Sequence, residues 1–319
     1  MPRKYTYRYT HFRPEEKEVT AEDKWQIPLS QDIVKNVLFN YLERKEIKTL
    51  SRLPSFKKSC EASLFLHYVA WGEQRKAELL LKNKPDLVLQ RGEVVDFSGR
   101  VFSNITALQY TVWALDRHMW KVIMQSFKDP DKALGQITEL EKNGVKYFQP
   151  KTSTRTKYEE VIEQHYDFSK AGRALEKLIK NYDDLNKERV KFAWVTAVGF
   201  EQRYFPAHLA SEWIDFGYQI QNFEKKQLVR QLHVLKPQNS ALGGAGRFIY
   251  WFDAVSLGID YAIFPKLGFG KSARIFLTVP FKNQLSAMLN NYNNLVNIRS
   301  HELDLLKENL SKAVNTISP

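Results

Sequence analysis

Two pairs of a histidine and a carboxylate are the residues of this sequence best suited to acid–base chemistry. Asp116 precedes His118 by two residues, and His208 precedes Glu212 by four. A carboxylate at such a spacing orients an imidazole, which titrates near neutral pH and can move a proton. However, none of the seven histidines belongs to an HExxH motif or to a zinc deaminase pattern. We interpret both histidines as hydrogen-bonded core or cap residues, and we predict no catalytic residue and no metal site.

Cys60 and Arg100 are two further residues with reactive or charged groups. Cys60 is the only cysteine, and a catalytic thiolate beside His67 would need a lowered pKa. Its apolar neighbours predict a small buried residue instead. Arg100 follows Ser98 and Gly99 in a turn, where its guanidinium could bind a carboxylate or a phosphate, or form a salt bridge that fixes the loop.

Glycine-rich segments near the C-terminus imitate nucleotide-binding loops without the required spacing. GFGKS spans residues 268–272, but Pro265 stands where a P-loop needs its first glycine. The LGGAGRF segment, residues 242–248, lacks both the GxGxxG spacing and a preceding βα unit. These glycines predict tight turns between strands, and we expect no cofactor.

Hydrophobic periodicity predicts a mainly α protein in several parts. Residues 1–24 show no period and predict a flexible arm, whereas residues 25–60 form two short helical faces. Residues 61–148 continue as helices around a turn or short hairpin at residues 92–104. Thr106 is a predicted helix N-cap there, and Asn143 with Gly144 a predicted C-cap.

The second half of the chain is predicted as a C-terminal helical domain with a small β element, residues 159–319. The polar, aperiodic residues 149–158 predict a linker before it, and helical period runs from there to Val198. Aromatic and β-branched runs at residues 247–252, 261–264 and 273–279 predict short strands. An apolar stripe predicts a final long helix from about Pro280.

Residues 25–60 resemble an F-box. Ile27, Pro28 and Leu29 match its Leu-Pro opening, and a helix ending in Tyr-Leu, a charged break and a Leu-rich second helix follow. The resemblance implies docking on a Skp-family adaptor of the cullin ubiquitin ligases, as a helix-in-groove interface. The implied binding face comprises Ile27, Pro28, Leu29, Ile33, Val34, Leu38 and Leu42. Alternatively, the same residues form an N-terminal core.

The middle of the chain is similar to a degenerate ankyrin pair, which implies a helical stack that binds proteins. Two repeat starts, at Leu66 and Leu108, lie 42 residues apart instead of the usual ~33. A wider resemblance joins the chain from residue 60 onward to Legionella-type effectors of the Dot/Icm type IV secretion system. Its motifs are DFSGRVF at residues 96–102, WALDRHMW at residues 113–120, Pro-Ala-His at residues 206–208, the glycine-rich tract and the long C-terminal helix. This resemblance implies delivery into the host cytoplasm, with Glu302, Asp304 and Glu308 as an acidic secretion signal.

Net charge and hydropathy bear on whether the chain binds a membrane or a nucleic acid. The formal net charge is +12, and residues 224–319 carry 12 basic groups against six acidic ones. Such a basic end raises an anionic membrane or a nucleic acid as a partner, although a solvated surface explains the charge as well. The basic residues concerned are Lys225, Lys226, Arg230, Arg247, Lys266, Lys271 and Arg274. We expect neither a Sec signal nor a transmembrane segment, because no long apolar run occurs.

These observations lead to one main hypothesis and three alternatives. The main one is a translocated, non-catalytic adaptor that recruits a host Skp–cullin ubiquitin ligase through its F-box-like face. The first alternative is a protein that binds or inhibits another effector or a host factor without ubiquitin involvement. A transferase or hydrolase in the glycine-rich region, and a membrane-binding or nucleic-acid-binding role, are the other two.

Overall fold

The computed structural model describes residues 54–96, 98–151, 157–215, 231–234, 247–250, 262–264, 273–275 and 281–317. Within these ranges only the backbone is described for residues 54–60, 214–215, 231–234, 247–250, 264, 273–275 and 317. The F-box-like face at residues 27–42 and the predicted arm lie outside the described residues. The side chains of Cys60 and of the basic C-terminal residues from Lys225 to Arg274 lie outside them too.

The chain is mainly α with a small β element, as predicted. In the first part lie α4 (Pro54–Ala70), α5 (Gln74–Asn83), the 3-10 helix η2 (Pro85–Leu89), α6 (Ala107–Trp113), α7 (Arg117–Met124) and α8 (Pro130–Asn143). The second part contains α9 (Ser169–Lys180), α10 (Lys187–Ala193), the π-helical turn η3 (Trp194–Gly199), α11 (Phe200–Gln202), α12 (Ala207–Asp215) and α13 (Lys282–Ile317). Among the described helices, none is both long and apolar enough to cross a membrane.

Two four-stranded sheets accompany these helices. The first is antiparallel, in the order β1 (Arg91–Val95), β2 (Val101–Thr106), β3 (Val145–Pro150), β4 (Tyr158–Glu163). The second has the order β6 (Arg247–Tyr250), β5 (Gln231–Val234), β8 (Ala273–Ile275), β7 (Ile263–Phe264). In it β5 and β8 are parallel and the other pairs are antiparallel. Strands β6, β7 and β8 fall in the three runs where the sequence predicts strands.

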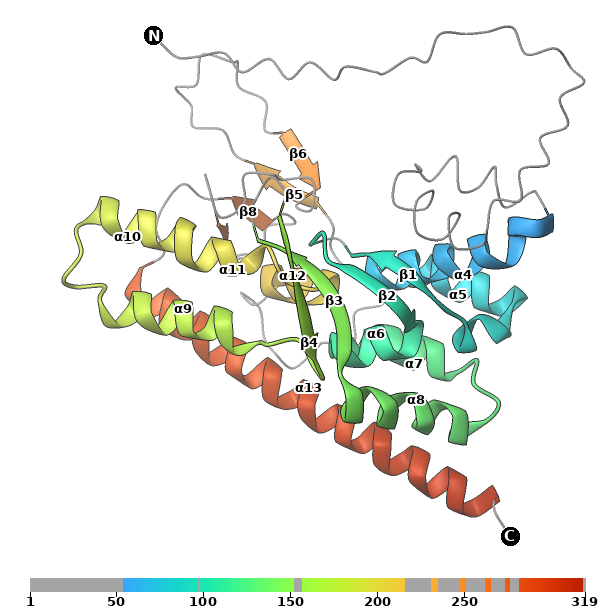
Figure 1. Cartoon of the computed structure of the whole chain (residues 1–319). Coiled ribbons are helices and arrows are strands. Elements are labelled where there is room, and N and C mark those ends of the chain that lie inside the picture. The colour runs from blue at the N-terminus through green and yellow to red at the C-terminus, as the bar shows by residue number, and fades with distance from the viewer. Residues whose placement is uncertain are drawn as a thin grey trace, which may run out of the picture.

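The long helix α13 ties the two parts of the molecule together. It runs along one side of the molecule and packs on α7, α8 and α9, all of which lie far before it in the sequence (Figure 1). Its buried face includes Leu285, Tyr292 and Leu295. The Tyr292 hydroxyl donates a hydrogen bond of 2.7 Å to the carbonyl oxygen of Phe168, which precedes α9. The predicted C-terminal helix is therefore confirmed, and it packs on helices of both parts of the chain.

The sequence-based prediction of helix at residues 158–163 is wrong. Tyr158–Glu163 is β4, and it pairs with β3 from Pro150↔Tyr158 to Val145↔Glu163. The two β-branched residues Val161 and Ile162 favour extended backbone, and exposure alternates along both strands as it does in a half-buried hairpin. Both ends of the segment predicted as a linker, residues 149–158, belong to this hairpin.

Residues 105–127, which have helical periodicity throughout, contain two separate helices in the structure. Thr106 caps α6 as predicted, since its hydroxyl accepts from the Gln109 backbone in a capping box. Leu115 then adopts a positive φ of 54°, which ends the helix, and the Asp116 carboxylate caps α7 by accepting from the Met119 backbone. A periodicity analysis does not detect this break, because both helices bury apolar residues on the same core.

Candidate functional site

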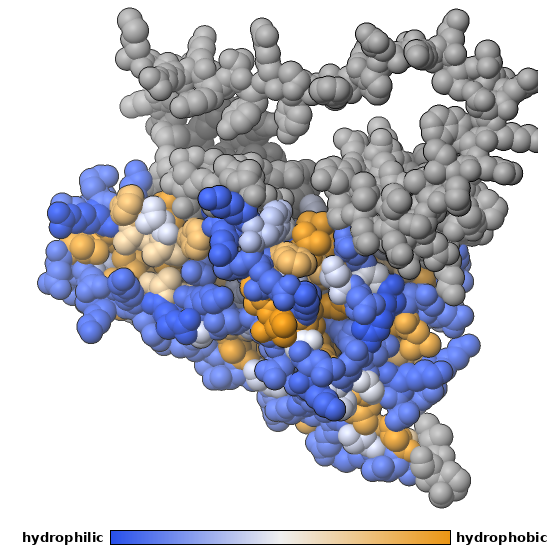
Figure 2. Space-filling view, in the orientation of Figure 1, coloured by the Kyte–Doolittle hydropathy of each residue, from blue (hydrophilic) through white to orange (hydrophobic). Residues whose placement is uncertain are grey.

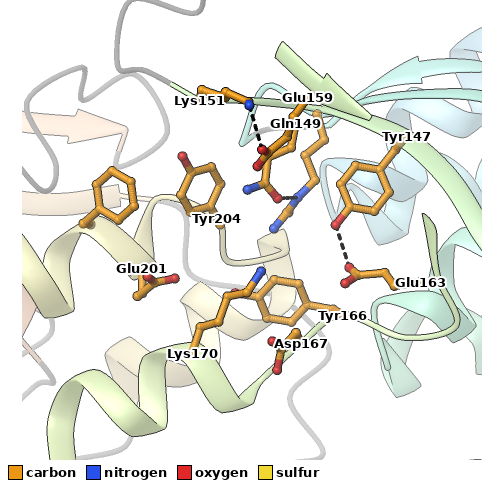
Figure 3. A pocket seen from close by; sticks show the side chains of 12 residues that line it. Tyr147, Gln149, Lys151, Glu159, Glu163, Tyr166, Asp167, Lys170, Glu201 and Tyr204 are labelled. Carbon is orange, nitrogen blue, oxygen red and sulfur yellow. Dashed lines mark hydrogen bonds and ion pairs between the residues drawn. The ribbon is translucent and has the colours of Figure 1, made fainter. Parts of the chain in front are cut away.

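A polar pocket lies where β3, β4, α9 and α11 meet. It has a volume of about 240 Å³, and Figure 3 shows side chains from all of these elements pointing into it. Tyr147 and Gln149 reach it from β3, because alternate residues of a strand share one face. Register pairs Gln149 with Glu159, so Glu159 and Glu163 reach the pocket from β4. The complete lining is Arg100, Tyr147, Gln149, Lys151, Glu159, Glu163, Tyr166, Asp167, Lys170, Phe200, Glu201 and Tyr204.

Arg100 forms one wall of this pocket and is fixed by a buried ion pair. Its side chain is 1% exposed, and Nη1 lies 3.4 Å from Oδ2 of Asp96 and donates to Ser98 Oγ at 3.1 Å. Burial opposes the charged guanidinium, but the adjacent Asp96 charge raises the pKa of Arg100 above its usual value. The loop-fixing salt bridge is thus the role that the structure assigns to Arg100. Aromatic rings of Trp113, Tyr147, Tyr166 and Tyr204 surround the guanidinium carbon at 5.1–5.6 Å.

The carboxylates of the pocket differ in their surroundings. Glu163 Oε1 accepts hydrogen bonds from the Tyr147 hydroxyl at 2.6 Å and from the Trp113 indole at 3.2 Å, so its orientation is fixed. Burial raises the pKa of Glu201 above its usual value, although the nearby Lys170 charge opposes this shift. Glu159 forms an ion pair of 3.2 Å with Lys151 at the rim.

A second cavity is a more apolar groove between α7 and α13, with a volume of about 510 Å³. Trp120, Met124 and Leu306 line its inner side, and Leu305 stands in it with 43% of its surface exposed. The rest of the lining is Arg117, Lys121, Gln125, Glu302 and Asn309. Arg117 and Glu302 form an ion pair of 2.6 Å between the two helices, which fixes their spacing. We call this cavity the α7–α13 groove.

The two predicted histidine–carboxylate pairs exchange partners in the structure. His118 Nε2 lies 3.2 Å from Glu212 Oε1, and His208 Nδ1 lies 3.8 Å from Asp116 Oδ2. The contacts therefore cross between α7 and α12 instead of forming within one helix. Arg299 of α13 pairs with Glu212 and, at 2.7 Å, with Glu302. Asp116, His118, His208, Glu212 and Arg299 form what we call the buried ion cluster.

The pKa shifts within the buried ion cluster indicate a structural role. Burial alone would raise the pKa of Glu212, but the Arg299 charge and a hydrogen bond from His118 lower it to about 2. Burial lowers the pKa of His208, so its imidazole is neutral at pH 7. Among the described residues, His208 Nε2 has no hydrogen-bond partner, and it lies in the core. These contacts join α7, α12 and α13. His118 is hydrogen-bonded, as interpreted from the sequence, whereas the 3.8 Å contact of the buried His208 with Asp116 is too long for a hydrogen bond.

Comparison with known proteins finds similarity to a protein family and to a bacterial protein that bears the same name. Residues 172–310 match the family described as the CBUA0006 C-terminal domain. The chain is also 31% identical over 212 residues to "Uncharacterized protein CBUA0006" of Coxiella burnetii (strain RSA 493 / Nine Mile phase I). That similarity covers 62% of this chain and 61% of the relative, so the chain spans less than two thirds of the relative's length. No solved structure matches the chain.

The matched family segment divides the buried ion cluster. His208, Glu212 and Arg299 lie inside residues 172–310, whereas Asp116 and His118 lie before them. Similarity to a Coxiella protein is consistent with a Coxiella- or Legionella-type effector, the coarser form of the predicted relationship. Glu302, part of the predicted acidic secretion signal, is ion-paired with both Arg117 and Arg299.

Sequence reasoning missed the polar pocket and the α7–α13 groove. The pocket depends on the β3–β4 hairpin, and period-two alternation at residues 145–150 and 158–163 is the signal that could have found it. The groove depends on the approach of α13 to α7, two helices separated by more than 150 residues, which no local pattern encodes.

Proposed function

We propose that this chain is a translocated bacterial effector that acts as a non-catalytic protein-binding adaptor. The observation that supports this function best is the α7–α13 groove. Its exposed Leu305 and the partly buried Met124 and Leu306 offer apolar surface for a partner to bury, above the buried Trp120. On the face shown in Figure 2, apolar side chains form small patches that are separated by polar ones. Small exposed apolar patches of this kind are normal for a protein surface.

An amphipathic helix with an acidic residue at one edge is the partner that suits this groove. Side chains from two helices, α7 and α13, form its walls, and a groove between helices can accept a partner helix. Lys121 is exposed in the lining, so an acidic side chain of the partner can pair with it. Large apolar side chains at the centre of such an interface carry most of the binding free energy.

The finer proposal concerns the ubiquitin system. In it, the F-box-like face from Ile27 to Leu42 recruits a host Skp-family adaptor, and the groove selects the protein to be modified. Two helix pairs, α4–α5 and α6–α7, flank the hairpin β1–β2, which supports the ankyrin-like, protein-binding part of this proposal. The predicted repeat start at Leu66 lies near the end of α4, and β1–β2 belongs to a four-stranded sheet, which is where the segment departs from an ankyrin pair. The alternative is a protein that binds or inhibits another effector or a host factor through the same groove, without ubiquitin involvement.

Affinity capture from eukaryotic lysate with four full-length proteins tests both levels of the proposal. The four are the wild type, Leu305→Asp in the groove, Pro28→Ala/Leu29→Ala in the F-box-like face, and Leu79→Asp as a control. Leu79 is a matched control because it is also a helical leucine, 52% exposed, on α5. Mass spectrometry then identifies the proteins whose capture each substitution removes.

Each substitution has a distinct expected result. A specific protein retained by Leu79→Asp and lost from Leu305→Asp is expected for the groove. Loss of Skp and cullin peptides from the Pro28→Ala/Leu29→Ala variant alone is expected for the ligase adaptor, whereas their absence from every sample favours the alternative. If Leu305→Asp captures every protein that the wild type captures, protein binding at the groove is contradicted.

A further inference from the structure

The polar pocket is large enough for a small ligand and is built from fixed side chains. Its volume of about 240 Å³ corresponds to roughly eight water molecules at about 30 Å³ each. The Tyr204 hydroxyl donates to the Pro150 carbonyl oxygen at 2.9 Å, and Phe200 packs edge-to-face on the Tyr204 ring. Two hydrogen bonds also hold Glu163 in one orientation. A ligand would therefore meet walls that are already ordered.

The balance of charge in the pocket is negative. Arg100 is neutralised by Asp96, and Lys151 is neutralised by Glu159. What remains is three carboxylates, those of Glu163, Asp167 and Glu201, against the single ammonium of Lys170. One of these, Asp167, also lies 3.8 Å from the exposed Arg173, so the surplus is one to two negative charges.

Of the three cationic side chains in the lining, Lys170 is the one that forms no ion pair within the described residues. Figure 3 shows the Lys170 side chain pointing into the pocket that Glu163, Asp167 and Glu201 line. Burial raises the pKa of Glu201, and the positive charge of Lys170 opposes that rise. This lysine is an exposed residue at the start of α9 on a flexible side chain, so it can leave the pocket at little cost.

We propose that this pocket binds a small organic cation, an alkylammonium or alkylguanidinium group, whose charge balances the surplus of carboxylates in the lining. Carboxylates hold such cations through charge-assisted hydrogen bonds, and Glu163 is already oriented to do so. The rings of Tyr147, Tyr166 and Tyr204 already contact the Arg100 guanidinium, so we attribute the proposed binding to the carboxylates. The site shares no lining residue with the α7–α13 groove, so this proposal does not rest on the proposed function.

Isothermal titration calorimetry of the full-length chain tests the proposal with four probes. Butylguanidinium and butylamine are the free cations, a blocked peptide with one central arginine presents the same group on a side chain, and butyrate is the matched anion. Comparison of free butylguanidinium with the peptide shows whether the source is a small molecule or a basic peptide.

Three variants change the charge of the pocket, and one control variant changes a charge outside it. Glu163→Gln and Glu201→Gln each remove one carboxylate charge while keeping an acceptor, and each is expected to weaken binding of the cation about tenfold. Lys170→Met removes the internal competitor and is expected to strengthen binding about fivefold. Glu160→Gln is the control, since Glu160 belongs to the same strand but is absent from the pocket lining and pairs with Lys146 at 2.6 Å.

The Lys170→Met variant decides between cation and anion. Tighter binding of butylguanidinium by Lys170→Met, with weaker binding by both glutamine variants and unchanged binding by Glu160→Gln, establishes the site. Binding of butyrate in preference to the cations, weaker cation binding by Lys170→Met, or no binding of either cation up to about 10 mM overturns it. Thermal melting of each variant confirms that a loss of binding is not a loss of fold.

Discussion

Removal of Arg299 is the sharpest test of how the fold is held together. Arg299 is 1% exposed and pairs with Glu212, which is itself 4% exposed, so Arg299→Leu leaves a buried carboxylate without its main counter-charge. Breaking a buried ion pair at one partner costs about 3–5 kcal/mol. We therefore expect Arg299→Leu to lower the free energy of unfolding at pH 7 by about that amount. Lys312→Leu, which removes an exposed pair with Glu308 from the same helix, is expected to change it little.

The pH dependence of this loss follows from the pKa of Glu212. Its pKa is about 2 in the folded chain against an ordinary value of 4.5, and at about 1.4 kcal/mol for each pH unit this difference is worth about 3 kcal/mol. Because the folded pKa is lowered, the wild type has this stabilisation fully above pH 4.5 and loses it as the pH falls toward 2. In Arg299→Leu the stabilising charge is absent, so the cost of the substitution is expected to shrink as acid protonates Glu212.

Urea denaturation followed by tryptophan fluorescence and circular dichroism measures both effects, at pH 7 and at about pH 3. The double variant Arg299→Leu/Glu212→Gln should be less destabilised at pH 7 than Arg299→Leu alone, since it buries no unpaired charge. A loss below about 1 kcal/mol at pH 7, or an equal loss at both pH values, would refute the assignment of a stabilising role to the buried ion cluster.

Two further predictions concern local structure, and thermal and urea melts check both. Gly144 has a φ of +70°, and a Cβ there would lie 2.9 Å from Ile162, so Gly144→Ala is expected to cost about 1–2 kcal/mol. Gly135→Ala has nothing within 4 Å and lies inside α8, so it should stabilise the chain by about 0.5–1 kcal/mol; the same sign at both glycines would contradict this reasoning. Thr106→Ala removes the cap of α6 and a 2.5 Å hydrogen bond to Gln136, with an expected cost of about 1–2 kcal/mol, while Thr106→Ser should retain most of the stability.

The features that the sequence predicts correctly are those that depend on local residues. Thr106 caps a helix because its hydroxyl reaches the backbone three residues later, and Gly144 ends α8 because a glycine adopts its positive φ readily. The long final helix follows from an uninterrupted apolar stripe. The short strands near the C-terminus follow from aromatic and β-branched runs between glycines.

The features that the sequence does not predict depend on contacts between distant segments. His118 and Glu212 are 94 residues apart, and the spacing of each with its sequence neighbour suggested a partner within one helix instead. The three glutamates of β4 favour a helix whereas Val161 and Ile162 favour a strand, and only pairing with β3 decides between the two. The polar pocket follows from that same pairing, so it could not be located without it.

The most direct test of the proposed adaptor function is photo-crosslinking from the α7–α13 groove. A photoreactive phenylalanine analogue is introduced at Leu305, and in a separate protein at Phe192, which is 69% exposed on α10 and lies outside the groove. After irradiation in eukaryotic lysate, mass spectrometry should find one protein joined through an amphipathic helical segment at position 305 and not at position 192. Crosslinks to the same proteins from both positions, or none from position 305, would contradict protein binding at this groove.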